Sequence, residues 1–315
     1  MDFCAFGNAV VDAHAHVTPA FLEQIGLRAG DSIAPAHDEL IAINEAMPIE
    51  AFHPGGSVAN CVWTLARLGH TCHMITQVAD DSAGQAFYDS MVKNGIQMPA
   101  PVKDDITFLV YVLLTANERS FVYPPRSCVM DTDWLQLEWI QSAKTLIVEG
   151  YTLLDQAPAA QAALAHAHQA GVQRVLTLGA PAVLQQAAAA LNDVIDQGVD
   201  LIFTDDDEWA MLQRLCTSEA LAVLQRTPRV TTHSGDGATY FDAAGHATFV
   251  PCEKIEQIAD ATGAGDTFAA GFLSAQNRGD TVEACLEAGH KLARRVIMQV
   301  GGRLQDAGPE LLKAV

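Results

Sequence analysis

The sequence feature that most constrains this chain is the segment Asp-Ala-Thr-Gly-Ala-Gly-Asp-Thr-Phe at residues 260–268. Gly263 and Gly265 let the backbone turn sharply and approach a ligand closely. A helical apolar pattern follows at once, with Phe268 and Phe272 on one face. A glycine-rich turn that opens a helix directs unpaired amides and the positive end of the helix dipole outward. The segment therefore predicts an anion site.

An acidic side chain, Asp266, stands directly beside this anion site. A carboxylate is poorly placed to bind phosphate there, but it is well placed to take a proton from a hydroxyl group that attacks the phosphate. The alternative is that Asp266 only caps the helix, and an isolated Gly-x-Gly would favour that interpretation. The complete nine-residue string is much more specific.

The segment resembles the C-terminal motif Asp-Thr-x-Gly-Ala-Gly-Asp of the ribokinase-like (PfkB) family of carbohydrate and nucleoside kinases. The resemblance implies that Asp266 is the catalytic base and that the amides of Gly263, Ala264 and Gly265 hold the transferring phosphoryl group. Ala261 departs from the pattern, since the family usually has Thr there.

A second glycine-bearing segment covers residues 53–69. Gly55-Gly56 predicts a tight turn, Ser57 is able to cap, and an apolar helical stripe follows until Gly69. Asn60, in the first turn, is either an ordinary capping amide or a ligand for a substrate hydroxyl.

This second segment resembles the N-terminal motif of the same family, Gly-Gly-x-x-x-Asn. The match implies that Asp12, Gly55, Gly56 and Asn60 line the pocket of the phosphoryl acceptor. Two motifs in the family's order, about two hundred residues apart, favour the functional interpretation of both.

The chain begins with an apolar run of strand type over residues 3–11, interrupted at Gly7-Asn8 and expected to end at Asp12. The carboxyl end of a strand is where open α/β sheets hold ligands. By itself, however, this run favours Asp12 as a simple strand end. Asp-Ala-His-Ala-His at residues 12–16 also resembles the metal-binding start of amidohydrolase barrels, with His14 and His16 on one strand face. Such enzymes need further ligands at later strand ends, and the sequence offers no convincing set.

Two runs rich in β-branched and aromatic residues, 107–114 and 120–123, predict a hairpin. The resemblance implies a small β-sheet lid over the active site, formed by insertions at about 13–50 and 105–127. The alternative places the hairpin in the main sheet. An exposed lid sheet could also pair with a second copy to form a homodimer.

From residue 146 onward, strands alternate with helices, which predicts βαβ units and a parallel sheet. The expected elements are strands 146–149, 174–178 and 201–203 with helices 158–170, 182–196 and 208–215. Together with the resemblance, this predicts one ribokinase-like domain over residues 1–315, a three-layer α/β/α sandwich with a central, mainly parallel sheet and a small lid.

Four acids, at positions 205–208, lie between a predicted strand and helix. They either stabilise the helix N-terminus or bind Mg²⁺, which prefers a few carboxylates plus waters and phosphates. The segment resembles the family's Asn-x-x-Glu motif, which implies that Asp205 and Glu208 govern Mg²⁺ and phosphate. Asp205 stands where the family has Asn, so a negative charge replaces an amide near the triphosphate.

The remaining expectations for ligands come from the resemblance. Residues 229–238 resemble the family's nucleotide loop, with Ser234 at its first Gly, and Ala288-Gly289-His290 resembles a segment of adenosine kinases near the adenine of ATP. The implied ATP-binding residues are Thr232, Ser234, Gly235, Gly237 and His290. A monovalent cation such as K⁺ is expected beside Asp260 and Thr262.

Composition limits the class of partner. The chain has 315 residues, is 50% hydrophobic and carries a formal net charge of −20, which argues against nucleic acid or an anionic membrane as partner. No apolar run approaches the roughly 20 residues that span a bilayer. The start of the chain lacks the basic residues of a signal peptide, and the seven cysteines contain no Cys-x-x-Cys pair, so a cytoplasmic protein is expected.

The sequence thus predicts a kinase that transfers the γ-phosphoryl group of Mg·ATP to a primary hydroxyl. A nucleoside kinase of the adenosine-kinase-like branch, acting on a 5′-hydroxyl, is the leading interpretation. A sugar kinase of the same family, acting on ribose, fructose or a related sugar, follows it. A metal-dependent amidohydrolase using His14 and His16 is distant, and an inactive binding protein is disfavoured because Asp266 and its glycines are present.

Overall fold

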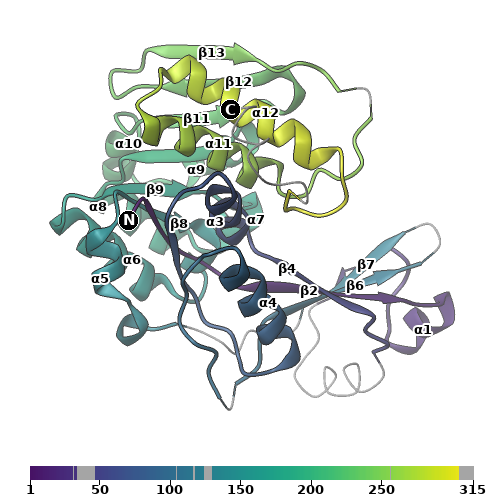
Figure 1. The fold of residues 1–315 in the computed structure, drawn as a ribbon. Helices are drawn as coiled ribbons and strands as arrows, with labels where there is room; N and C mark the ends of the chain where they lie inside the picture. The colour runs from purple at the N-terminus through teal and green to yellow at the C-terminus, as the bar shows by residue number, and fades with distance from the viewer. Residues whose placement is uncertain are drawn as a thin grey trace.

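The computed structural model describes residues 1–30, 32–33, 47–103, 105–115, 118–123, 130–255 and 257–304. They form an α/β body and a small second sheet that extends away from it (Figure 1). No helix in these ranges is both long and apolar enough to cross a bilayer.

The body is built on an eight-stranded sheet with the order β13-β12-β11-β10-β9-β8-β1-β5. Neighbouring strands from β11 to β5 are parallel, and the antiparallel pairs are β11–β12 and β12–β13. The strands are β1 (Phe3–Phe6), β5 (Cys72–Ile75), β8 (Thr145–Glu149), β9 (Gln173–Thr177), β10 (Leu201–Asp205), β11 (Arg229–Thr232), β12 (Gly237–Phe241) and β13 (Ala247–Pro251).

Helices cover both faces of this sheet and bury two separate apolar cores. Alternation along β1 shows why: Phe3 and Ala5 enter one core, and Cys4 and Phe6 enter the other. The first core is covered by α3 (Ser57–Arg67), α4 (Ser82–Lys93), α11 (Ala264–Arg278) and α12 (Val282–Ile297). The second is covered by α5 (Leu137–Ser142), α6 (Ala157–Gln169), α7 (Pro181–Gln186), α8 (Ala188–Gln197), α9 (Asp206–Leu215) and α10 (Ser218–Leu224).

The small sheet has five strands in the order β3-β7-β6-β2-β4 and its own apolar core. Its elements are β2 (Val10–His16), α1 (Pro19–Gln24), β3 (Ser32–Ile33), β4 (Ala51–Gly55), β6 (Leu109–Leu114) and β7 (Arg119–Val122). The predicted hairpin is therefore present as β6 and β7, and it belongs to this sheet rather than to the main one. The sheet extends beyond the predicted segments, because β2 begins at Val10 and β4 ends at Gly55. Parts of those segments, residues 34–46 and 124–127 among them, lie outside the described residues.

The predicted fold class, an α/β/α sandwich with a mainly parallel sheet and a second small sheet, is confirmed in its architecture. Two local predictions are wrong. The N-terminal run does not end at Asp12, because the chain leaves the large sheet after Phe6 and continues as β2, with Asp12 inside that strand. The helix predicted over 182–196 is divided into α7 and α8 at Ala187, and no Gly or Pro in the sequence signals the break.

Candidate active site

The N-terminus of α11 is fixed by glycines. Gly263 is its N-cap, with φ +75°, and a Cβ there would lie 2.4 Å from the carbonyl oxygen of Gly302. Only glycine adopts this conformation without strain and fits this contact. Gly265, by contrast, faces open space, because a Cβ there would meet no atom within 4 Å. The turn is thus tightly packed on one side and open on the other.

Asp266 lies in the first turn of α11, and its carboxylate accepts two hydrogen bonds from α3. The Ser57 hydroxyl donates to Oδ1 at 2.7 Å, and the Asn60 amide Nδ2 donates to Oδ2 at 3.0 Å. Burial raises the pKa of Asp266 to about 6, although both hydrogen bonds and the charge of Arg303 act to lower it. A carboxylate with such a pKa is ionised at neutral pH and is able to take up a proton.

The predicted cap residue of α3 has a different role. The N-cap of α3 is Gly56, without a side-chain hydrogen bond, and Ser57 bonds Asp266 instead. The capping interpretation of Ser57 is therefore wrong, since the left-handed φ of +96° places glycine rather than a hydroxyl residue at the cap.

The backbone amides of the glycine-rich turn are not equivalent. The Ala264 amide donates to the carbonyl oxygen of Ala261 at 3.2 Å, so this turn bond already engages one of the three amides predicted to hold phosphate. The other two predicted amides belong to Gly263 and Gly265, and Gly265 faces the open side.

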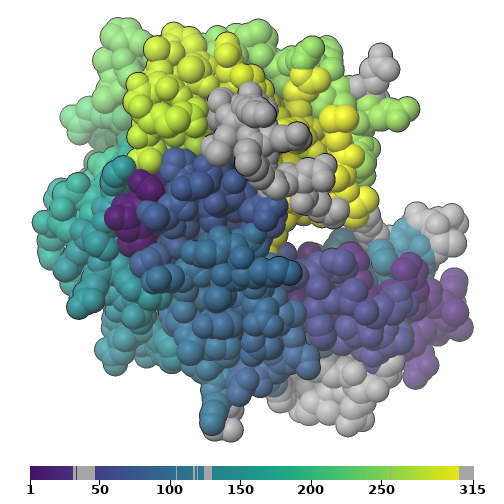
Figure 2. Space-filling view, viewed as in Figure 1, coloured from purple at the N-terminus to yellow at the C-terminus, as the bar shows by residue number. Residues whose placement is uncertain are grey.

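A first cavity of about 620 Å³ opens where Asp266 faces the carboxyl ends of the large sheet. It includes Asn8, just after β1, and Glu149, at the end of β8. The chain runs in opposite directions across the sheet from these two strands, and ligand crevices form at such switch points. In the space-filling view, the small sheet stands out from the body with an opening between the two (Figure 2).

Aromatic and apolar side chains make up much of this lining, and no described lining residue is Lys, Arg or His. The aromatic members are Phe108, Tyr123, Tyr151, Phe203 and Phe268. The hydroxyl oxygen of one further lining residue, Thr177, is buried without a hydrogen-bond partner among the described residues.

A second cavity of about 550 Å³ adjoins the first. All five residues predicted to bind ATP line it: Thr232, Ser234, Gly235, Gly237 and His290. Thr232, Gly265 and Phe268 line both cavities, so the two meet at the N-terminus of α11. Within the second cavity, His290 Nε2 lies 3.1 Å from the carbonyl oxygen of Val250.

The four predicted acceptor-binding residues divide into two pairs. Gly56 and Asn60 line the first cavity, whereas Asp12 and Gly55 are not among its lining residues. These two lie next to each other on paired strands, since a Cβ at Gly55 would be 3.7 Å from Asp12 Oδ2. Burial raises the pKa of Asp12 to about 6.

Asp205 and Glu208 form a capping box at the start of α9. The Glu208 amide donates to Asp205 Oδ1 at 2.8 Å, and the Asp205 amide donates to Glu208 Oε2 at 3.0 Å. The helix-cap interpretation of these acids is therefore correct, and both also line the first cavity. Burial, reinforced by the charge of Asp205, raises the pKa of Glu208 to about 7.

The predicted cation residues contact each other. The amide and hydroxyl of Thr262 donate to Asp260 Oδ1 at 3.0 and 2.7 Å, and the Gly301 amide donates to Oδ2 at 3.1 Å. Asp260 thus joins the glycine-rich turn to the segment that follows α12.

The amidohydrolase interpretation is wrong, because the main sheet is open and ends at β13 and β5 rather than closing into a barrel. His14 contacts the ring of His53, with centroids 4.3 Å apart, and His16 Nδ1 lies 2.8 Å from Glu50 Oε2. Within the described ranges, no three His, Cys, Asp or Glu side chains form a group able to hold a metal.

Three site residues were not found from the sequence: Ser57 in its present role, Glu149 and Arg303. Glu149 is 1% exposed and accepts the amides of Asn8 and Val58 at 2.7 and 2.9 Å, which ties β1 and α3 to β8. The sequence signals none of these contacts, since the residues are far apart in the chain and no motif includes Glu149 or Arg303.

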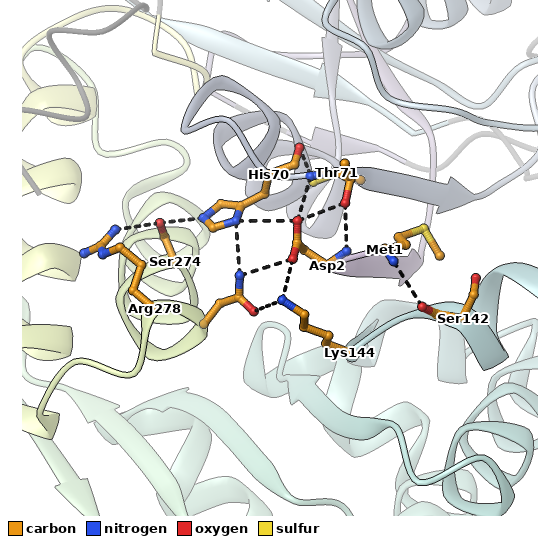
Figure 3. Close-up of polar contacts among 10 residues, drawn as sticks. Met1, Asp2, His70, Thr71, Ser142, Lys144, Ser274 and Arg278 are labelled. Carbon is orange, nitrogen blue, oxygen red and sulfur yellow. Dashed lines mark hydrogen bonds and ion pairs between the residues drawn. The ribbon is translucent and has the colours of Figure 1, made fainter.

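The far end of α11 is anchored by a polar network (Figure 3). Asp2 accepts from Lys144 Nζ at 2.9 Å, from the Thr71 amide at 3.1 Å and from Asn277 Nδ2 of α11 at 3.3 Å. His70 Nε2 lies 2.8 Å from the Ser274 hydroxyl, also on α11. The helix that carries Asp266 is therefore fixed to the amino ends of β1, β5 and β8.

The fold and the two joined cavities, together with the similarity to known proteins, define a ribokinase-like kinase, a phosphotransferase with an alcohol group as acceptor. The family model described as pfkB family carbohydrate kinase matches residues 41–307, and the chain belongs to this family.

Similar proteins cover nearly the full length. Adenosine kinase from Saccharomyces cerevisiae is 26% identical over 94% of both chains. The crystal structure of adenosine kinase from Sinorhizobium meliloti is 27% identical, with a TM-score of 0.83, covering 99% of this chain and 98% of that one. A probable sugar kinase from Rhizobium etli is 26% identical, with a TM-score of 0.82, covering 99% and 97%.

Proposed function

We propose that this protein is an ATP-dependent kinase that phosphorylates the 5′-hydroxyl of a neutral, adenosine-like nucleoside. One observation carries the proposal: two cavities meet at a glycine-rich helix N-terminus, and a hydrogen-bonded carboxylate, Asp266, lines the first cavity next to Gly265, which lines both. This arrangement suits a transfer between two ligands, because helix N-termini stabilise the anionic group that passes between them.

In this proposal Asp266 is the general base. It accepts the proton of the acceptor hydroxyl as the acceptor oxygen forms a bond to the γ-phosphorus, while the bond from that phosphorus to the β,γ-bridging oxygen breaks and ADP leaves. Ser57 and Asn60 hold the carboxylate in position. The amides of Gly263 and Gly265 stabilise the transferring group, without help from the engaged Ala264 amide.

ATP occupies the second cavity in this proposal, with Thr232, Ser234, Gly235, Gly237 and His290 around it. Asp205 and Glu208 fit Mg²⁺, because the ion uses one or two carboxylates together with waters and phosphates. When bound, Mg²⁺ neutralises charge on the phosphates. The capping box occupies Asp205 Oδ1 and Glu208 Oε2. The other carboxylate oxygen of Asp205, Oδ2, takes no part in these two capping hydrogen bonds.

The acceptor is argued from the first cavity. Five aromatic side chains favour a ligand with a planar base over a free sugar, which would leave them uncovered. The described lining offers four carboxylates, Glu149, Asp205, Glu208 and Asp266, and no basic side chain, so a neutral acceptor is favoured over a sugar acid or a sugar phosphate. Thr177 Oγ1 supplies an unused hydrogen-bonding group. The adenosine kinases among the similar proteins support the same choice.

Two further expectations belong to this proposal. A K⁺ ion beside Asp260 and Thr262 would make the activity higher in KCl than in tetramethylammonium chloride.

A homodimer through the small sheet would use its edge strands, β3 or β4, and is tested by the mass in solution.

The experiment that tests the proposal measures ADP release from Mg·ATP with adenosine, inosine, guanosine, cytidine, ribose and fructose. We expect adenosine or another purine nucleoside to give the highest kcat/KM. A response to free sugars alone would contradict the nucleoside assignment and leave Asp266 as the base. No ADP release with any acceptor would contradict the proposed reaction.

A further inference from the structure

The segment that follows α12 packs directly against the proposed catalytic centre. A Cβ at Gly302 would lie 3.0 Å from Asn60 Nδ2, and the Gly302 carbonyl oxygen fills the space beside Gly263. Gly301 donates to Asp260. Backbone contacts of this kind bring the next residue, Arg303, into the centre of the site.

The Arg303 guanidinium binds three elements around the centre. Nε donates to Asn60 Oδ1 of α3 at 3.0 Å, Nη1 donates to Ser90 Oγ of α4 at 3.0 Å, and Nη2 donates to the Gly55 carbonyl oxygen of β4 at 3.4 Å. Its Cζ also lies 5.5 Å from the ring centroid of buried Phe87. The planar guanidinium group is therefore held in one orientation, because each of its three nitrogens donates to a different partner.

We propose that Arg303 is a positioning residue for phosphoryl transfer: it fixes the Asn60 amide so that Nδ2, and not Oδ1, faces Asp266. A guanidinium only donates hydrogen bonds, so the Asn60 oxygen must face Arg303 and the amide nitrogen must face the carboxylate. That orientation suits an ionised Asp266, which only accepts. The inference rests on the proposed role of Asp266 as base.

The charges around the site support this arrangement. Burial lowers the pKa of Arg303 to about 9, while the charges of Asp266 and Asp12 raise it, so the guanidinium remains charged at neutral pH. Its charge in turn lowers the pKa of Asp266. The other titratable groups that act on or respond to Asp266 are Cys61 of α3, Tyr151 and Glu208. Arg303 is the cation in this set.

The test compares Arg303→Met, which removes the charge and the donors, with Arg303→Lys, which keeps the charge. In Arg303→Met we expect kcat to fall about 10- to 100-fold, because the base loses its fixed partner, with little change in ATP affinity. The acid limb of the kcat/KM profile should move to higher pH, because the charge that lowers the Asp266 pKa is gone. Arg303→Lys should keep that limb near its wild-type position.

The matched control is Arg67→Met, on the same helix as Asn60. Arg67 also donates to an asparagine, Asn94, and lies over an aromatic ring, Trp63, at 5.2 Å, but it lies outside the site. Its kcat and pH profile should match those of the wild type.

A double-mutant cycle tests the path through Asn60. If Arg303 acts through that amide, Asn60→Ala combined with Arg303→Met should lower kcat little more than Asn60→Ala does alone. If Arg303→Met does not fold, the cycle is measured with Arg303→Lys. A folded Arg303→Met with wild-type kcat and acid limb, or losses that multiply in the double variant, would overturn the inference. The Asp266→Asn variant, measured in the same assays, separates this inference from the proposed function. If that variant is inactive, the proposed function stands even when the Arg303 inference is overturned. If it is active, the proposed function itself is refuted.

Discussion

Replacing Asp266 with Asn removes the proposed base while keeping the shape of the side chain. The Asn60 amide would still donate to the new side-chain oxygen, and the Ser57 hydroxyl would rotate to accept from the new amide nitrogen. No buried polar atom is then left without a partner, so we expect the variant to fold and to bind ATP as the wild type does.

The magnitudes follow from the environment of the carboxylate. General-base catalysis contributes about 100- to 10,000-fold, or about 3 to 5 kcal/mol, so kcat should fall by that factor. Burial raises the pKa of Asp266 from 3.8 to about 6, so at pH 7 the ionised group costs up to about 3 kcal/mol of folding free energy. This cost is present at pH values above the pKa that Asp266 has in the unfolded chain. There the unfolded carboxyl group ionises freely, whereas burial disfavours the ionised form in the folded protein. The Asn variant should therefore be at least as stable as the wild type at pH 7.

The assay combines kcat, the Kd of ATP, the thermal midpoint and the pH profile of kcat/KM. The wild-type kcat/KM should fall below about pH 6, reaching about a tenth of its plateau at pH 5, as Asp266 becomes protonated. The Asn variant should lose this acid limb. A folded Asp266→Asn enzyme with kcat within a few-fold of the wild type would refute the reasoning.

Three further predictions concern the turn, the acids and the anchor of α11. Gly263→Ala should lower stability by about 1 to 3 kcal/mol in thermal unfolding, because its φ is positive and its Cβ meets backbone. Gly265→Ala, where space is open, should keep stability but reduce ATP turnover; equal melting of the two variants would contradict the packing argument. Glu208→Gln keeps the capping hydrogen bonds with Asp205 and removes the charge of the side chain. The Mg²⁺ concentration for half-maximal activity should therefore rise. An unchanged Mg²⁺ titration would contradict the assignment of Asp205 and Glu208 to Mg²⁺. Asp2→Asn should lower the thermal midpoint at pH 7 without changing kcat. Hydrogen bonds, of which the one from Lys144 has the largest effect, lower the pKa of Asp2. The contribution of Asp2 to folding stability is therefore present above pH 4 and is lost as the pH falls. A difference in thermal midpoint between variant and wild type that persists undiminished at pH 2 would contradict this.

The sequence was most informative where one local segment determines both structure and chemistry. The turn before α11 and the start of α3 were predicted because glycine spacing and apolar periodicity are local properties. The hairpin of β6 and β7 and the alternation after residue 146 were predicted for the same reason. The four predicted residues of the nucleotide loop and His290 all line one cavity.

Other features depend on contacts that the sequence does not encode locally. Position 7 accepts glycine, because a Cβ built there would collide with the side chain of Val58, and a linear pattern does not reveal that collision. The neighbours of Ser57 in the sequence predict a helix cap, whereas its hydrogen-bond partner, Asp266, is more than two hundred positions away. Arg303 follows α12 without any motif, and only the folded chain brings it to Asn60.

The most direct test of the account is the identity of the product. The protein is incubated with Mg·ATP and adenosine, and the product is examined by ³¹P NMR, with 5′-deoxyadenosine as the matched control acceptor. The account predicts AMP, with the new phosphorus coupled to the two 5′ protons, and no transfer to 5′-deoxyadenosine. Phosphate on a 2′- or 3′-hydroxyl, or transfer to free sugars but not to nucleosides, would contradict it.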